Sequence, residues 1–453
     1  MKIIVVGLGK VGELLTETLA KENHDLIVID LDRNKINDIV NRYDVNGICG
    51  NGATSDILAQ CDIQHTDMLI SVTSEDELNI LVGMVGKKLG AKHVIARVRN
   101  PDYSKYGSFF VEQFGFSMIV NPEAETATEI LRLITFPNAS SIETFAKGKI
   151  ELVGIKMTEQ TSLNDHALHQ LRKISRANVL ICAVRRDNEI IIPSGNFVIK
   201  AGDELYITGA HFDITCFCVD IGLMRRRIKN VTMVGGSRIA YYLALLLDKQ
   251  DIRSKIIEKD GARCVDLAER LPNATIISGD ASDEDLLIEE GIEKTDALVC
   301  LTGMDEENIV LSLLAKQLNV KKVIAKVNSS AMSNMINRLP IDSVISPKHV
   351  IANQIIGYVR AKSNDDESDT VQTMYRLVDE QVEALEFVAS SNHDYYGKPL
   401  QELRIKKGIL VAAILRNGIL TVPKGNTTIE LGDHVMVIAK NKKIERLSDI
   451  FED

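Results

Sequence analysis

The chain has 453 residues, of which 45% are hydrophobic, and its formal net charge at pH 7 is −10. This length predicts about three domains with buried cores, and the acidic balance argues against a surface built to bind nucleic acid. The seven scattered cysteines include no C-x-x-C pair, so they support neither a zinc site nor a disulfide framework, and no uncharged apolar run is long enough to span a membrane.

The chain opens with an apolar run, residues 2–6, that ends at a glycine-rich turn. Gly7, Gly9 and Gly12 have the G-x-G-x-x-G spacing, and Asp30 closes the next apolar run. In a dinucleotide site the first glycine makes a tight turn, the second admits the pyrophosphate, and the third lets the helix pack on the strand. An acid at the end of the second strand hydrogen-bonds ribose hydroxyls. This stretch therefore predicts a dinucleotide-binding turn.

Strand and helix patterns alternate from residue 1 to about residue 139. We expect strands at 2–6, 26–30, 46–49, 68–72, 93–98 and 117–120, and helices near 11–22, 33–42, 54–60, 76–89 and 101–114. Such alternation predicts a parallel sheet with helices on both faces.

A different pattern follows residue 140. We expect strands at 149–157, 179–192 and 204–208, a helix near 163–173, and a hairpin turn at 186–188. These elements form a small α+β module of about 80 residues. Such a module is too small for a conventional catalytic domain.

The second half of the chain repeats the first. Corresponding residues of the two halves are separated by 228 to 230 positions. Examples are the pairs Gly7 and Gly235, Asp30 and Glu258, Thr73 and Thr302, Arg97 and Lys326, and Pro193 and Pro423. Because this separation varies by only two residues, it indicates that the whole first half is duplicated in the second. We expect an α/β fold with two Rossmann-like parallel-sheet lobes, 1–139 and 228–361, each followed by a small α+β lobe, 140–227 and 368–453. The acidic stretch 362–370 predicts a linker.

Ligand-facing residues of the first lobe should lie at the carboxyl ends of its strands. Thr73 and Ser74 follow the fourth strand and can offer hydroxyl and backbone N–H groups. After the fifth strand we prefer Arg97 over Arg99, because the second copy keeps a cation, Lys326, at the place of Arg97. The alternative is a surface arginine paired with an acid such as Glu123. Residues 50–54 should border adenine and ribose.

The second copy departs from the glycine pattern. Ser237 replaces Gly9 and Ala240 replaces Gly12, while Glu258 and Lys326 remain. A side chain at 237 hinders close approach of a phosphate to the backbone. Asp280, in the segment 278–282, also has no acidic equivalent in the first copy. Two alternatives stay open: a second nucleotide site of different preference, or a structural copy with an empty site.

Catalytic motifs are absent from the sequence. It contains no G-x-S-x-G, H-E-x-x-H or P-loop lysine motif. His166 and His169 have no histidine counterparts in the second module. An NAD-dependent dehydrogenase stays an alternative, but it needs an acid/base residue beside the nicotinamide, which the small modules do not offer.

A family resemblance extends over essentially the whole chain. It is carried by GLGKVG at 7–12, VID at 28–30, GNGAT at 50–54, SVTS at 71–74, IARVRNPDY at 95–103, VNPE at 120–123, IPSG at 192–195 and AGD at 201–203. With their repetition, these residues resemble the RCK (KTN) family of potassium-transport regulators, and the duplicated form resembles its TrkA branch. The resemblance implies a non-enzymatic, cytoplasmic regulatory subunit, associated peripherally with the inner face of the membrane. It also implies a ring-like homo-oligomer, a dimer or tetramer, that gates a membrane potassium channel or transporter of the Trk or Ktr type.

The same resemblance implies a set of ligand-binding residues. NAD(H), or ATP and ADP, would be held in the first lobe by Gly7, Leu8, Gly9, Lys10, Val11, Asp30, Thr73, Ser74 and Arg97. The corresponding residues of the second lobe are Gly235, Ser237, Arg238, Ile239, Glu258, Thr302 and Lys326. Some relatives bind cyclic di-AMP in the small lobe. No residue in the small lobes of this chain supports such binding. Regulation of another cation transporter stays an alternative, since such modules are reused.

Overall fold

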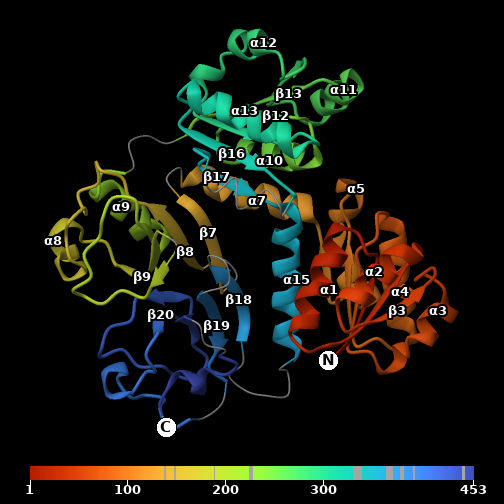
Figure 1. The fold of residues 1–453 in the computed structure, drawn as a ribbon, viewed down its shortest axis with the longest axis horizontal. Coiled ribbons are helices and arrows are strands. Elements are labelled where there is room, and N and C mark those ends of the chain that lie inside the picture. The colour runs from red at the N-terminus through yellow and green to blue at the C-terminus, as the bar shows by residue number, and fades with distance from the viewer. Residues whose placement is uncertain are drawn as a thin grey trace. The chain divides into compact units, whose positions relative to one another are not determined.

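The computed structural model describes residues 1–136, 139–146, 149–187, 189–223, 228–329, 339–363, 371–377, 382–390, 393–440 and 444–452 (Figure 1). Asn188 of the predicted hairpin turn and residues 364–370 of the predicted linker lie outside this part of the chain. The structure forms two compact units, residues 1–128 with 345–359 and residues 129–344 with 360–453.

The first lobe contains a six-stranded parallel sheet in the order β3-β2-β1-β4-β5-β6. Its strands are β1 (Lys2–Val6), β2 (Asp25–Asp30), β3 (Asn46–Cys49), β4 (Met68–Ser71), β5 (His93–Arg97) and β6 (Met118–Val120). Its helices are α1 (Lys10–Lys21), α2 (Arg33–Arg42), α3 (Ser55–Gln60), α4 (Asp76–Leu89), α5 (Pro101–Ser104), α6 (Gly107–Phe114) and α7 (Pro122–Thr135). The predicted doubly wound fold is confirmed, and the reversal of strand order between β1 and β4 creates a binding crevice.

The helix predicted near 101–114 is interrupted in the structure. The structure replaces the helix at 101–114 with two short ones, α5 and α6. Asn100 caps the first by accepting a hydrogen bond from the N–H of Asp102, and Pro101 occupies its first position. Gly107, a poor helix former, begins the second.

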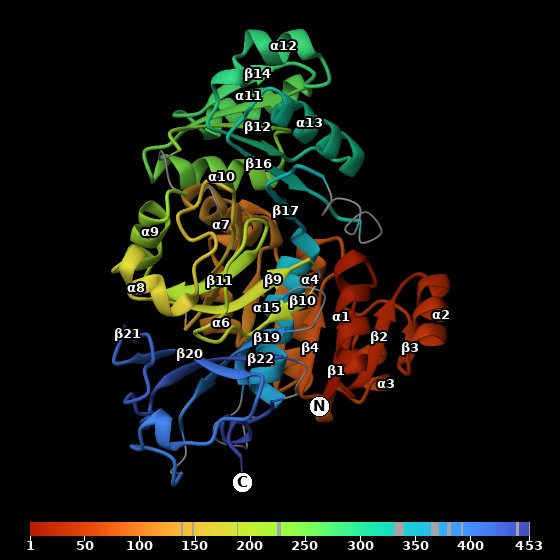
Figure 2. The same cartoon turned by 60° about the vertical axis from the view of Figure 1, so that its left-hand side comes forward.

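Helix α15 (Pro347–Ser363) packs on the first sheet although it follows the second sheet in sequence (Figures 1 and 2). Its apolar residues Ile351, Ile355 and Val359, spaced four apart, belong to one buried cluster with Ile3 and Val5 of β1. This spacing places them on one helix face. A segment of the second half therefore completes the core of the first lobe.

The second lobe repeats the sheet order as β14-β13-β12-β15-β16-β17. Its strands are β12 (Asn230–Val234), β13 (Arg253–Glu258), β14 (Thr275–Ser278), β15 (Ala297–Cys300), β16 (Lys322–Lys326) and β17 (Ser343–Ile345). Its helices include α10 (Arg238–Asp248), α11 (Gly261–Arg270), α12 (Glu284–Glu289) and α13 (Asp305–Gln317). The predicted duplication of the parallel-sheet lobe is confirmed.

Each small lobe contains a five-stranded antiparallel sheet, ordered β10-β9-β11-β8-β7 and β18-β19-β22-β20-β21. The strands of the first are β7 (Ala139–Phe145), β8 (Ile150–Lys156), β9 (Val179–Arg186), β10 (Glu189–Ile191) and β11 (Glu204–Gly209). Those of the second are β18 (Val371–Leu377), β19 (Val382–Val388), β20 (Ile409–Arg416), β21 (Ile419–Thr421) and β22 (His434–Lys440). Residues of both sheets, among them Phe145, Ala183, Ala384 and Met436, form one buried cluster.

The first small lobe departs from its prediction at three places. The helix expected near 163–173 is wrong, because only a 3-10 turn at Leu168–Gln170 and one helical turn, α8 (Leu171–Ile174), form there. Strand β7 and helix α9 (His211–Asp220) were not predicted. The segment 179–192, by contrast, forms the hairpin of β9 and β10 that the predicted turn at 186–188 requires.

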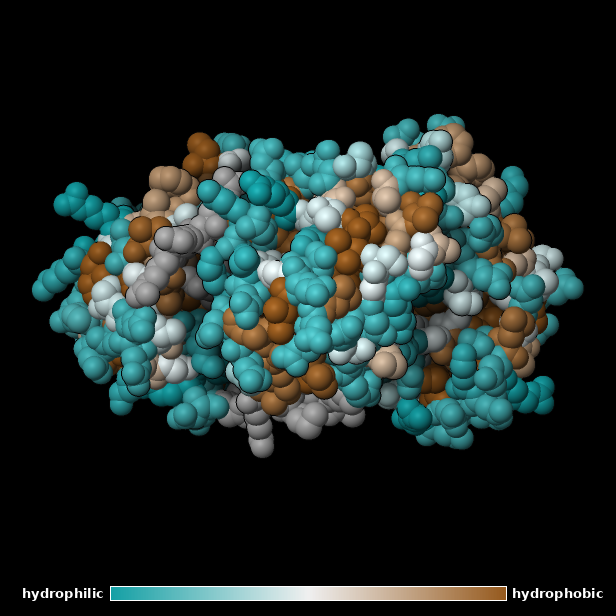
Figure 3. Space-filling view, turned by 90° about the horizontal axis from the view of Figure 1, so that it is seen from above, coloured by the Kyte–Doolittle hydropathy of each residue, from teal (hydrophilic) through white to brown (hydrophobic). Residues whose placement is uncertain are grey.

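Hydrophilic side chains cover much of the face drawn in Figure 3, and its hydrophobic residues stand in separate patches. In the described part of the chain, no helix has both the length and the apolar character needed to cross a bilayer.

Candidate functional site

A cavity of about 380 Å³ lies at the carboxyl ends of β1, β2, β4 and β5. Among the residues that line it are eight predicted ones: Gly7, Gly9, Lys10, Val11, Asp30, Thr73, Ser74 and Arg97. Gly50, Asn51 and Gly52, which follow β3, also line it, as expected for the segment 50–54. We call this space the first cavity. Its volume lies in the range of small-molecule sites.

Close packing requires glycine at two of the three glycine positions in the turn. Gly7 has a φ of +98°, and a Cβ there would lie 2.8 Å from the Cα and backbone N of Thr73. A Cβ at Gly12 would lie 1.9 Å from the carbonyl oxygen of Gly7. Gly9, by contrast, caps α1, and apart from its two chain neighbours no residue has an atom within 4 Å of the place of a Cβ. The N-terminal N–H groups of α1 therefore open onto space that an anion can occupy.

Asp30 orients the same turn through its carboxylate. Its Oδ2 accepts a hydrogen bond from the backbone N–H of Leu8 at 2.6 Å, and its Oδ1 accepts one from Asp32 at 2.9 Å. Leu8 does not line the cavity, and neither do Ala53 and Thr54 of the segment 50–54. Each carboxylate oxygen can accept further hydrogen bonds, so Asp30 can hold the loop and a ribose hydroxyl together.

Asn79 joins the ends of β4 and β5 beneath the cavity, a role that sequence reasoning missed. Its Oδ1 accepts hydrogen bonds from the N–H and Oγ1 of Thr73 at 2.8 and 2.7 Å. Its Nδ2 donates to the carbonyl oxygens of Arg97 and Thr73 at 2.9 and 3.2 Å. The side chain is fully buried. Its counterpart in the repeat, Asn308, was the available sequence signal.

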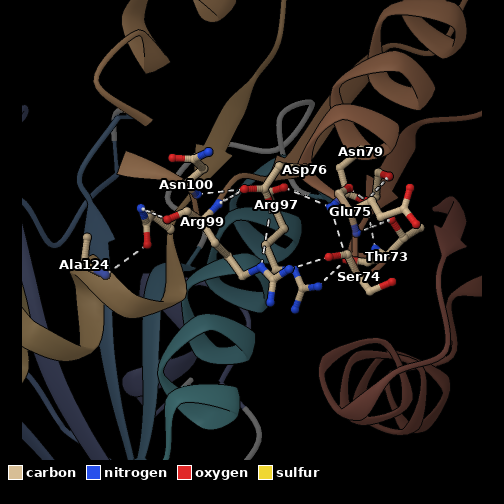
Figure 4. Close-up of polar contacts among 11 residues, drawn as sticks. Thr73, Ser74, Glu75, Asp76, Asn79, Arg97, Arg99, Asn100 and Ala124 are labelled. Carbon is tan, nitrogen blue, oxygen red and sulfur yellow. Dashed lines mark hydrogen bonds and ion pairs between the residues drawn. The ribbon is translucent and has the colours of Figure 1, made fainter. Parts of the chain in front are cut away.

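Asp76 is a second polar support that was missed. Its Oδ2 accepts hydrogen bonds from the backbone N–H groups of Arg99 and Asn100 at 2.9 and 2.7 Å. Figure 4 shows the guanidinium groups of Arg97 and Arg99 near the turn that carries Thr73 and Ser74. Arg97 donates to the carbonyl oxygen of Thr73, and Arg99 donates to that of Ser74.

The charges around the first cavity include three cations, Lys10, Lys35 and Arg97, and two acids, Asp30 and Glu75. Lys35 was not predicted; it lies on α2, within one turn of the helix start and a few residues beyond Asp30. The excess of positive charge, together with the N-terminus of α1, suits a phosphate group.

A cavity of about 320 Å³ occupies the corresponding place in the second lobe. We call it the second cavity. Four predicted residues, Gly235, Ser237, Glu258 and Thr302, line it. Arg238, Ile239 and Lys326 lie outside its lining, and the Nζ of Lys326 donates to the carbonyl oxygen of Leu301 at 3.5 Å.

The polar supports are repeated in the second lobe. The Oε2 of Glu258 accepts a hydrogen bond from the N–H of Gly236 at 2.6 Å, as Asp30 does from Leu8. Asn308 accepts from the N–H of Thr302 at 2.9 Å and donates to the carbonyl oxygen of Lys326 at 3.0 Å. The duplication therefore preserved the scaffold of the crevice.

Comparison with protein families and curated proteins gives consistent matches. The TrkA-N domain matches residues 3–122 and 231–347, and the TrkA-C domain matches residues 152–214 and 384–452. The Trk system potassium uptake protein TrkA homolog of Archaeoglobus fulgidus is 33% identical over 451 residues, covering 100% of both chains. The TrkA protein of Haemophilus influenzae is 31% identical over 460 residues, covering 100% of this chain and 99% of its own.

Solved structures share the fold at low sequence identity. The structure described as the GsuK channel bound to NAD has a TM-score of 0.64 at 17% identity, covering 97% of this chain and 77% of its own. The GsuK RCK domain has a TM-score of 0.63 at 16% identity, covering 97% and 92%. With both domain types present twice and with full-length relatives of this kind, the chain belongs to the TrkA family of Trk system potassium uptake proteins.

Proposed function

We propose that this chain is a nucleotide-sensing regulatory subunit of a potassium-uptake system, with NAD(H) or ATP and ADP bound in the first cavity. The observation that carries the proposal is the joint presence of an open helix N-terminus, a carboxylate and three cations around one cavity. The names of the relatives support the link to potassium uptake. The NAD-bound GsuK channel, which has the same fold, supports the choice of nucleotide.

The residues of the first cavity suit a dinucleotide in chemical terms. The space beside Gly9 and the N–H groups of α1 would receive the phosphates, with Lys10 and Arg97 supplying positive charge. Asp30, already oriented by two backbone N–H groups, would accept hydrogen bonds from ribose hydroxyls. The residues near Gly52 would border the adenine.

Regulation requires that the nucleotide bind one conformation of the protein better than another. A difference of about 1–3 kcal/mol in binding free energy gives a useful bias. The Asn79 network suits this role, because it ties the cavity residues Thr73 and Arg97 to the ends of two strands. The chain itself then needs no catalytic group.

The proposal includes a ring-like homo-oligomer, a dimer or tetramer, at the inner face of the membrane. Its partner is a membrane channel or transporter of the Trk or Ktr type, whose gate it controls. Leu81 on α4 is 49% exposed, and Val310, at the same place on α13, is 63% exposed. A single exposed apolar side chain is ordinary on a protein surface, so the support for contact between subunits comes only from its repetition at the same place in both lobes.

The test combines nucleotide binding with potassium transport. The purified full-length chain is titrated separately with NADH, NAD⁺, ATP and ADP, and potassium uptake is measured in cells that lack the chain or carry Asp30→Ala. We expect nucleotide binding, and reduced uptake in both altered strains. Absence of binding, or unchanged uptake in the deletion strain, would overturn the proposal. Sustained NADH oxidation with a keto acid would instead favour the dehydrogenase alternative.

A further inference from the structure

The charged residues that line the two cavities differ in their balance of sign. Whereas the first has three cations against two acids, the second is lined by one cation, Lys259, and three acids, Glu258, Asp280 and Glu307. Because nearby charges act strongly in a partly enclosed site, the two cavities should attract ligands of different charge.

Two substitutions between the repeats create most of this difference. Asp280 stands at the place of Gly52, and Glu307 stands at the place of Leu78. Asp280 accepts hydrogen bonds from the N–H and Oγ of Ser282 at 2.9 and 2.8 Å, which lower the pKa of its carboxyl group. Asp280 therefore lines the cavity in its ionised form at neutral pH.

The second cavity has also lost two features that attract phosphate. Ser237 caps α10, and its Oγ accepts a hydrogen bond from the N–H of Ala240 at 3.4 Å. Arg263, at the place of Lys35, donates through Nε to the carbonyl oxygen of Gly236 at 2.7 Å and pairs with Asp266. In the second lobe the protein itself therefore uses the N–H of Ala240 and the guanidinium of Arg263. The corresponding groups of the first lobe can face a ligand in the cavity.

We infer that the second cavity binds a nucleoside that carries no pyrophosphate or polyphosphate and whose base bears an exocyclic amino group, as adenosine does. Ionised carboxylates accept hydrogen bonds from ribose hydroxyls and from amino groups, and they repel phosphates. Glu258 repeats the orientation of Asp30, so it serves the ribose, and Asp280 serves the amino group of the base. The inference goes beyond the proposed function, which concerns the first cavity.

The test titrates adenosine, AMP and ADP by calorimetry into the full-length chain after saturation with NADH. EDTA is present, so that no divalent cation can bridge phosphates to the carboxylates. We expect one adenosine site per chain and an affinity that falls from adenosine to AMP to ADP, by about tenfold or more over the series. Inosine, which has a carbonyl group in place of the amino group, should bind more weakly than adenosine.

Three variants locate the effect. Asp280→Gly and Glu307→Leu install the residues of the first cavity, and each should raise the affinity for ADP relative to adenosine about fivefold or more. Asp280→Gly should also reduce the preference for adenosine over inosine. Glu284→Ala removes an exposed acid outside the cavity and should leave both ratios unchanged.

Three outcomes would overturn the inference: no adenosine binding, ADP binding as tight as that of adenosine, or unchanged ratios in both cavity variants. The initial NADH titration reports on the first cavity alone. Its failure would contradict the proposed function, and the adenosine series would then be measured on the chain without NADH. The two proposals therefore fail separately.

Discussion

The carboxylate of Asp30 accepts a hydrogen bond of 2.6 Å from the backbone N–H of Leu8, inside the glycine turn. The acid at the end of β2 therefore fixes the loop beside it before any ligand arrives. Glu258 makes the same contact with Gly236 at 2.6 Å in the second lobe. Such a preorganised carboxylate costs less to order on binding than a mobile one.

Replacement of Asp30 by alanine should weaken NADH binding about tenfold to a hundredfold. The variant loses the acceptor for ribose hydroxyls and also leaves the N–H of Leu8 without its carboxylate. Fluorescence titration of NADH measures the effect. Asp25→Ala is the control, because Asp25 is exposed at the opposite end of the same strand. Equal affinities of Asp30→Ala and the wild type would contradict the role of this acid.

The parallel-sheet lobes could be predicted from the sequence because their signals are local. An apolar run followed by glycines marks β1 and its turn, and the acid after the next run marks the end of β2. Because corresponding residues recur 228 to 230 positions later, the same strands and helices could be predicted for the second lobe. Helix α4, for example, begins at Asp76 and ends at Leu89 as predicted.

The remaining features depend on tertiary structure. Strand β7 was missed because its pattern depends on pairing with β8 rather than on a local apolar run. The packing of α15 on the first sheet joins residues more than 340 positions apart, such as Ile3 and Ile351. Asn79 was missed because an asparagine in a helix, even one repeated as Asn308, does not show which partners bury it.

Replacement of Asn79 by alanine should lower the free energy of unfolding by about 2–4 kcal/mol. Five hydrogen bonds are lost, and the partly buried N–H of Thr73 loses its acceptor. Urea unfolding measures the loss. NADH affinity should also fall about tenfold, since Thr73 and Arg97 are no longer held in place.

The repeat supplies the matched control for this prediction. Asn308→Ala removes the corresponding contacts to Thr302 and Lys326. It should also destabilise the protein, but it should leave NADH binding in the first cavity unchanged. If both variants weaken NADH binding equally, the loss reflects general destabilisation rather than the local role of Asn79.

Lys322 is a fully buried lysine at the start of β16. Its Nζ donates to the carbonyl oxygen of Ala139 at 2.7 Å and to the Oγ of Ser343 at 3.0 Å, and so links the second lobe to β7. Burial lowers the pKa of Lys322 from 10.5 to about 8, with Lys316 acting in the same direction and Asp342 opposing it. The charged form is thus costly in the folded state.

The free energy of unfolding of the wild type should therefore rise with pH between about 8 and 10.5, relative to Lys322→Met. In this window the unfolded lysine binds a proton that the folded lysine has lost, so increasing pH favours the folded state. Urea unfolding of both proteins across this pH range measures the difference, in which other titrating groups cancel. A difference that stays constant or falls with pH would contradict the lowered pKa of Lys322.

Replacement of Gly9 by serine should separate nucleotide binding from folding. The backbone at Gly9 has φ −79° and ψ −173°, which any residue adopts, and a Cβ there meets no atom within 4 Å apart from those of its two chain neighbours. The free energy of unfolding should therefore change by no more than about 1 kcal/mol. NADH affinity should nevertheless fall at least about tenfold, because the side chain fills the space for phosphate and caps α1 as Ser237 caps α10.

Gly12→Ala, whose Cβ would lie 1.9 Å from the carbonyl oxygen of Gly7, should instead destabilise the protein. Wild-type NADH affinity in Gly9→Ser would show that phosphate does not approach this turn.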